Sequence, residues 1–126
     1  LEIGSGPGRL LMVAKLSNLL NCHRYAGFDL NNETVLLGQK ALGLEDELFV
    51  ANALEFDYSE FDVMFSYRPI RVPEMQIALE KRIVETMKPG AYLMAPLSED
   101  LARYPELRCV NKPLATWRKS VPDGDS

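Results

Sequence analysis

Three glycines at alternate positions stand near the start of the chain, in the stretch LEIGSGPGRLL. Gly4, Gly6 and Gly8 follow a short apolar run that contains the acid Glu2, and helix-forming residues come directly after them. Glycine is used where the backbone must turn sharply or come very close to another group. We therefore expect a turn from a strand into a helix here, with a ligand against the backbone.

Polar side chains end three further segments that have strand character. Asp29 closes RYAGFDL, Asn52 closes ELFVAN, and Ser66 and Tyr67 close FDVMFSY. In a doubly wound sheet, ligands bind beyond the carboxyl ends of the strands, where the strand order reverses. We expect these residues and the glycine turn to form one site at a single edge of a sheet.

Strand and helix patterns alternate along the chain, and the predicted strands would bring the glycine turn and the polar strand-end residues together. Strands are predicted over 1–3, 24–30, 47–52, 61–67, 91–95, 107–111 and 114–120, and helices over 9–20, 31–42, 73–88 and 98–104. Asn31 or Asn32 is expected to cap the second helix, and Gly43 to end it. The tail over 121–126 is polar and is expected to be loose.

The apolar positions of two helices predict their buried faces. In the first helix these positions are Leu10, Val13, Ala14 and Leu20, and in the third they are Met75, Leu79, Ile83 and Met87. Alternating strands and helices predict the α/β class, with a doubly wound, mostly parallel sheet and helices on both faces. We expect one domain over 1–126.

Composition narrows the class of protein. The chain has 126 residues, 47% of them hydrophobic, with a net charge of −4 and two cysteines. An acidic balance disfavours a general nucleic-acid surface, and no apolar run is long enough for a membrane span. Two distant cysteines and no visible signal peptide favour a cytoplasmic protein with reduced thiols. Because residue 1 is a leucine within a predicted strand, we expect the chain to be a piece of a longer protein.

The glycine pattern reads E-x-G-x-G-x-G from Glu2 to Gly8. A nicotinamide-binding G-x-G-x-x-G turn would need a third glycine at position 9, which is Arg9. The pattern resembles motif I of the class I S-adenosylmethionine-dependent methyltransferases. Later segments resemble this family's strands in the same order, namely YAGFDLNNETVLLGQKALGL, VANALEF, EFDVMFSY and ETMKPGAYLMA, so the resemblance covers roughly residues 1–96.

The resemblance implies a Rossmann-like methyltransferase fold, S-adenosylmethionine as cofactor, and a set of cofactor-binding residues. Asp29 would accept both ribose hydroxyls, and hydrogen bonds to a charged group contribute about 1.5–3 kcal/mol each. Glu2 would face the amino-acid end of the cofactor, usually through water. The remaining implied residues are Gly4, Ser5, Gly6 and Gly8 along the cofactor, Leu30, Asn52, Ala53 and Leu54 around the adenine, and Ser66.

Each of these roles has a structural alternative. The glycines could simply make a tight turn, and Asp29 could only cap the helix that follows it. Asn52 could be an ordinary turn residue, and Leu30 and Leu54 could belong to the core. These alternatives stay open at the level of sequence.

The implied reaction is methyl transfer by in-line displacement, which depends mainly on proximity and orientation. The acceptor is expected near SYRPIRVPE, where Tyr67, Arg68 and Arg71 are candidates for acceptor binding, although the arginines could equally be solvated loop charges. By resemblance, the absence of an N/D-P-P-Y/F motif, a Pro-Cys nucleophile and a metal-binding acid set disfavours amino-methylation of adenine or glutamine, cytosine C5 chemistry and a metal.

Two other functions remain possible at this point. One is a non-catalytic subunit that binds S-adenosylmethionine and acts as a regulatory or partner protein. The other is an NAD(P)-dependent oxidoreductase, against which Arg9 argues. For a methyltransferase, a small molecule or a protein is favoured as acceptor over nucleic acid.

Overall fold

A computed structural model describes residues 1–18 and 20–122. The chain divides into two compact units, Leu1–Glu55 and Phe56–Ser126, and each is described by itself.

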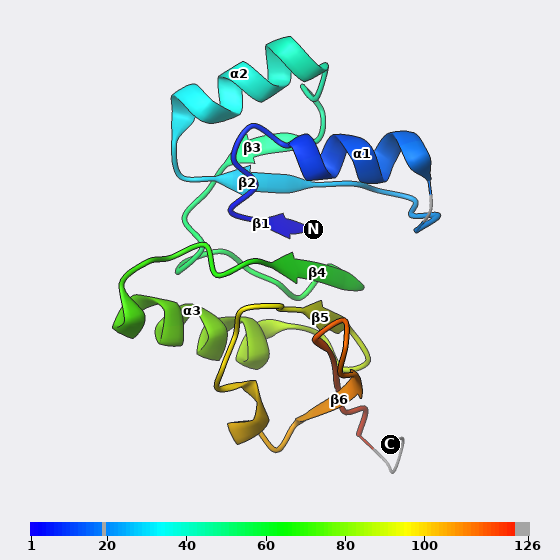
Figure 1. Cartoon of the computed structure of the whole chain (residues 1–126), viewed down its shortest axis with the longest axis vertical. Coiled ribbons are helices and arrows are strands. Elements are labelled where there is room, and N and C mark those ends of the chain that lie inside the picture. Colours follow the sequence, from blue (N-terminus) through cyan, green and yellow to red (C-terminus); the bar gives the residue numbers. More distant parts are fainter. Residues whose placement is uncertain (19, 123–126) are drawn as a thin grey trace. The chain divides into compact units, whose positions relative to one another are not determined.

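The first unit is built on three short parallel strands, β1 (Glu2–Ile3), β2 (Gly27–Asp29) and β3 (Leu48–Val50), with β2 in the middle. Helix α1 (Arg9–Ser17) connects β1 to β2, and α2 (Asn32–Leu42) connects β2 to β3 (Figure 1). The two helices contact each other, as expected for successive right-handed crossovers on one face of the strands. All three strands therefore end at one edge.

The core of the first unit contains Leu11, Val35, Leu44 and Leu48. The predicted face of α1 is wrong, because Leu10, Val13 and Leu20 are exposed and Leu11 is the helix's buried residue. The stretch LLMVAKLSNLL is apolar on every side, so its spacing could not identify the packed side. The helix also ends at Ser17, earlier than predicted, because Asn18 takes a left-handed conformation with φ 52°. Leu19, in the predicted extension, lies outside the described residues.

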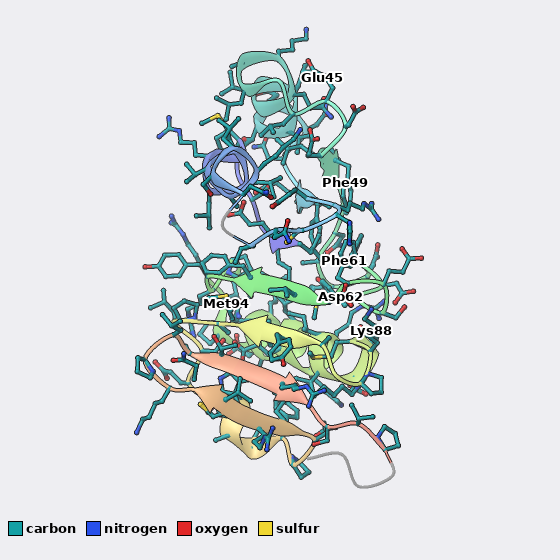
Figure 2. The ribbon with its side chains drawn as sticks, turned by 90° about the vertical axis from the view of Figure 1, so that its right-hand side faces the viewer. Glu45, Phe49, Phe61, Asp62, Lys88 and Met94 are labelled. Atoms are coloured by element: carbon teal, nitrogen blue, oxygen red, sulfur yellow. The ribbon has the colours of Figure 1, made fainter. Side chains whose placement is uncertain are left out.

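The second unit contains β4 (Val63–Ser66), β5 (Tyr92–Met94), β6 (Leu107–Asn111) and β7 (Thr116–Lys119). These strands lie side by side in the order β4-β5-β7-β6, with β4 and β5 parallel and the other pairs antiparallel (Figure 2). Helix α3 (Pro73–Thr86) connects β4 to β5. The helix predicted over 98–104 is a single 3₁₀ turn, η1 (Leu101–Arg103).

Helix α3 has a buried face that includes polar residues. Leu79, Ile83 and Met87 are buried as predicted, but Met75 is 44% exposed, so its predicted burial is wrong. The buried positions at this end of the helix are Gln76 and Glu80. At the other end, the Lys119 ammonium donates to the carbonyls of Val84 and Met87, at 2.7 and 2.8 Å, which satisfies the last turn.

The predicted strands are all present, and most are shorter than expected because their ends open into loops. Asn31 caps α2 and Gly43 ends it, as predicted. Residues 123–126 of the predicted loose tail lie outside the described residues. Within the described ranges, no helix is both long and apolar enough to cross a membrane.

Candidate functional site

The glycine loop follows β1 and crosses to the end of β2. Gly4, Gly6 and Gly8 all have positive φ angles, of 69°, 57° and 89°. The Ser5 amide donates to the Phe28 carbonyl at 2.8 Å, which holds the loop against β2. No atom lies within 4 Å of the place where a Cβ would stand on Gly6. Gly6 therefore combines a conformation that side chains rarely adopt with open space beside its backbone.

Asp29 joins this loop to the end of β2. Its Oδ2 accepts the Gly6 amide and its Oδ1 accepts the Asn31 amide, each at 3.0 Å. An ionised carboxylate offers about four acceptor positions, so both oxygens keep capacity for further donors. The alternative that Asp29 caps the next helix is wrong, because the cap is Asn31, whose side chain accepts the Thr34 amide at 3.0 Å.

Asn52 follows β3 at the same edge. Its Oδ1 accepts the Leu54 amide at 3.0 Å, so its side chain closes a local turn. The Ala51 amide donates to the Asp29 carbonyl at 3.2 Å, which brings the ends of β2 and β3 together. Leu30 is 70% exposed, so the alternative that it belongs to the core is wrong. Ala53 and Leu54 are half-buried.

Glu2 lies under the first turn of α1. Burial raises the pKa of its carboxyl group to about 7, and a hydrogen bond from the Leu11 backbone partly opposes this rise. The helix has no side-chain cap of its own at Gly8, so Glu2 supplies an acceptor to its first turn from β1. The Oε1 atom is buried and has no hydrogen-bond partner in the described part of the chain. Such an atom calls for a ligand or a water molecule.

Gly38, which was not predicted from the sequence, supports the glycine loop from α2. A Cβ on Gly38 would lie 2.0 Å from the Pro7 carbonyl oxygen, so only glycine lets α2 approach the loop this closely. A glycine inside a helix costs about 1 kcal/mol relative to alanine. Its presence in the middle of a predicted helix was the signal that could have identified it.

The other predicted site residues belong to the second unit. Ser66 ends β4, is 1% exposed, and has a hydroxyl without a partner among the described residues. Tyr67 is exposed and its ring contacts that of Phe65 at 6.2 Å. Arg68 is half-buried with a φ of 41°, and Arg71 is exposed. Among residues 1–18 and 20–122, no three His, Cys, Asp or Glu side chains are grouped so that they could hold a metal ion.

The structure thus brings together the glycine loop, Asp29 and Asn52 at the edge of the first unit. Gln76 and Glu80 were not identified from the sequence. The signal for them was two polar residues, four positions apart, on a face of α3 whose other members are apolar.

Comparison with known proteins gives matches among solved structures. No model of a known protein family matches the chain, and no curated protein matches it either. The methyltransferase domain of bacterial CtHen1 superposes with a TM-score of 0.61 at 20% identity, over 75% of this chain and 54% of that one. The N-methyltransferase NodS of Bradyrhizobium japonicum WM9, in complex with S-adenosylhomocysteine, gives 0.57 at 17% identity, over 75% and 49%.

A third match is CalS10 of Micromonospora echinaspora, an amino pentose methyltransferase bound to S-adenosylmethionine. Its TM-score is 0.58 at 17% identity, over 82% of this chain and 44% of that one. The chain therefore spans about half the length of these solved structures, or less. The α/β class and the mostly parallel strands agree with the prediction from the sequence. The chain has the fold of the class I S-adenosylmethionine-dependent methyltransferases.

Proposed function

We propose that this chain binds S-adenosylmethionine and is the cofactor-binding part of a methyltransferase. The observation that carries the proposal is the pairing of Asp29 with Gly6, which sets a carboxylate with spare acceptor positions beside an open stretch of glycine backbone. Solved structures of this fold contain S-adenosylmethionine or S-adenosylhomocysteine, as in CalS10 and NodS.

The residues fit the chemical groups of this cofactor. A ribose presents two adjacent hydroxyl donors, which the carboxylate of Asp29 can accept. The exposed Leu30 follows β2 and offers apolar surface to an adenine ring, and Asn52, Ala53 and Leu54 follow β3, the strand that pairs with β2. The buried Oε1 of Glu2 is an acceptor for a water molecule or an ammonium group. Gly4, Ser5 and Gly8 complete the proposed backbone cradle. Ser66, in the second unit, is a separate candidate for cofactor binding, because its buried hydroxyl has no partner among the described residues.

When bound, the cofactor supplies a methyl group on a sulfonium. Asp29, Glu2 and the glycine backbone would hold it, and it would offer the acceptor an electrophilic methyl carbon with a neutral thioether as the leaving group. The protein's part is to hold the two reactants in line. A base is needed only where the acceptor carries a proton.

The proposal is tested by ligand binding to the full chain. S-adenosylhomocysteine should raise the melting temperature, because a ligand at 100 times its Kd stabilises the folded state by about 2.7 kcal/mol. NAD and NADP, at equal concentration, should leave it unchanged. A shift with NAD and none with S-adenosylhomocysteine would contradict the proposal.

Methyl transfer itself is tested with labelled S-adenosylmethionine and a panel of small amines, alcohols, thiols and carboxylates, together with proteins. We propose that Tyr67, Arg68 and Arg71 contact the acceptor. The guanidinium groups suit a carboxylate or phosphate on it.

A further inference from the structure

A chain of buried polar side chains lies on α3, next to the loop that follows β4. Gln76 and Glu80 are 1% and 4% exposed, and the Gln76 amide donates to Glu80 Oε2 at 2.8 Å. The Ser98 hydroxyl donates to the same oxygen at 2.6 Å. On the other side, Gln76 Oε1 accepts the Ile70 amide at 3.1 Å. These four groups connect the loop after β5, through α3, to the loop after β4.

Both loops leave the sheet at the same edge of the second unit. Strands β4 and β5 are parallel, with Phe65 opposite Met94. Figure 2 shows Met94 at the far end of this strand pair from Asp62 and Lys88, whose ion pair of 2.5 Å lies where the strands begin. Ser98 and Ile70 thus follow the carboxyl ends, which is where ligands bind in sheets of this type.

The hydrogen-bond donors and acceptors around Gln76 fix the orientation of its side-chain amide. Glu80 Oε2 accepts two donors, from Gln76 and Ser98. Because a carboxylate oxygen that accepts both cannot donate, the NH₂ group of Gln76 must face Glu80. This leaves Oε1 toward the Ile70 amide. Glu80 therefore determines whether Gln76 offers an acceptor to the loop, although no hydrogen bond joins Glu80 to the loop directly.

The loop that this network holds has an unfavourable backbone. Arg68, between Tyr67 and Pro69, has a φ of 41°, and a left-handed conformation costs a side-chain-bearing residue roughly 1–2 kcal/mol. Such strain persists only where the surroundings over-determine the backbone, and it concentrates at functional sites. Burying Gln76 and Glu80 on the otherwise apolar face of α3 also costs free energy unless each side chain is hydrogen-bonded. Together, these features favour a role in loop shape over a role in packing.

We propose that Gln76, Glu80 and Ser98 are positioning residues that hold the loop over residues 67–72 in the shape that receives the methyl acceptor. This deepens, and rests on, the proposed methyltransferase function. The loop carries Tyr67, Arg68 and Arg71, so the network determines the backbone positions from which these side chains extend. Its effect on the acceptor passes through the Ile70 amide.

The test is amide hydrogen exchange on the full chain, which needs neither cofactor nor acceptor. Glu80→Leu should speed exchange at Ile70 by about tenfold or more, because Gln76 loses the partner that orients it. The Tyr92 amide, which donates to Asp62 at the opposite end of the strands, should keep its rate. Glu80→Gln should restore the Ile70 rate, since an amide oxygen can accept both donors. Glu85→Leu, an exposed site on α3, is the matched control.

Ser98→Ala gives a second variant should Glu80→Leu not fold, and a smaller rise at Ile70 is expected. Equal acceleration at Ile70 and Tyr92 would mean a general loss of stability and would overturn the proposal. An unchanged Ile70 rate would also overturn it.

A second readout is kinetic. Glu80→Leu should raise the KM of an acceptor from the panel about tenfold and leave the affinity for S-adenosylhomocysteine unchanged. Failure of the wild-type chain to bind S-adenosylhomocysteine refutes the methyltransferase function and leaves the exchange result standing.

Discussion

The carboxylate of Asp29 serves the protein before any ligand arrives. It accepts the Asn31 amide at the start of α2 and the Gly6 amide of the glycine loop, which lies 23 residues before Asp29 in the chain. The same group is the acceptor that we assign to the ribose. Affinity and stability are therefore coupled at this one residue.

We expect Asp29→Ala to weaken S-adenosylhomocysteine binding about 10–100-fold, equivalent to about 1.4–2.7 kcal/mol. The free energy of unfolding should also fall, by about 1.5 kcal/mol, because two amides lose a charged acceptor. Asn31→Ala is the control: it removes the cap of α2 and about 1 kcal/mol of stability, with affinity unchanged. Calorimetric titration and denaturant unfolding measure both quantities. Wild-type affinity in Asp29→Ala would contradict the ribose role.

Glu2 makes stability depend on pH. Its folded-state pKa is about 7, raised by burial above the ordinary value of 4.5. The folded state therefore binds more protons than the unfolded state between these values, so its contribution to stability falls as pH rises from about 4.5 to about 7. The loss is complete above that window.

Glu2→Gln removes this titration and keeps an oxygen for the Leu11 amide. We expect the variant to be more stable than the wild type at pH 8, with the difference shrinking toward pH 5. Thermal unfolding across this pH range measures it. A difference that is constant with pH would show that Glu2 titrates normally in the folded protein.

At the level of the elements, α2 can pack closely against the glycine loop because residue 38 is a glycine. A methyl group there would meet the Pro7 carbonyl at 2.0 Å, and the backbone would have to move because no flexible side chain can yield. The loop residues Gly6 and Gly8 flank Pro7. A change in α2 is thereby transmitted to the proposed cofactor cradle.

Gly38→Ala should lower the free energy of unfolding by about 1–3 kcal/mol, despite the higher helix propensity of alanine, because overpacking displaces backbone. It should also weaken S-adenosylhomocysteine binding. Gly43→Ala is the matched control, since Gly43 ends the same helix with φ 67° and has no atom within 4 Å of an added Cβ. It should lose about 1 kcal/mol from strain alone, with affinity unchanged. Equal affinities in the two variants would contradict the link from α2 to the loop.

At the scale of the whole molecule, the two units carry different proposed tasks. The residues assigned to the cofactor lie in Leu1–Glu55, apart from Ser66, and those assigned to the acceptor lie in Phe56–Ser126. Substituting a residue assigned to the acceptor should therefore change the affinity for the acceptor and leave the affinity for the cofactor unchanged.

We expect Arg68→Ala or Arg71→Ala to raise the KM of an anionic acceptor from the panel and to leave the Kd of S-adenosylhomocysteine unchanged. Lys81→Ala, an exposed cation on α3, is the charge-matched control and should change neither. Steady-state kinetics and calorimetric titration provide the two values. Unchanged KM values for both arginine variants would return these residues to the solvated surface.

The fold class could be predicted from the sequence alone, and candidate site residues could be proposed from it. Strand and helix periodicities are local, and so are the signals that bound them, such as Asn31 before α2 and Gly43 after it. The E-x-G-x-G-x-G pattern likewise lies within seven residues. Such features can be predicted because neighbours along the chain determine them.

Which helix faces are buried, and which distant groups meet, depends on how the elements pack in three dimensions. Helix α1 is apolar all round, so only packing selected Leu11. The pairing of Asp29 with Gly6, the approach of Gly38 to Pro7, and the bond from Ser98 to Glu80 each join residues far apart in sequence. No local propensity encodes these contacts, because each depends on the angle and distance at which separate elements pack.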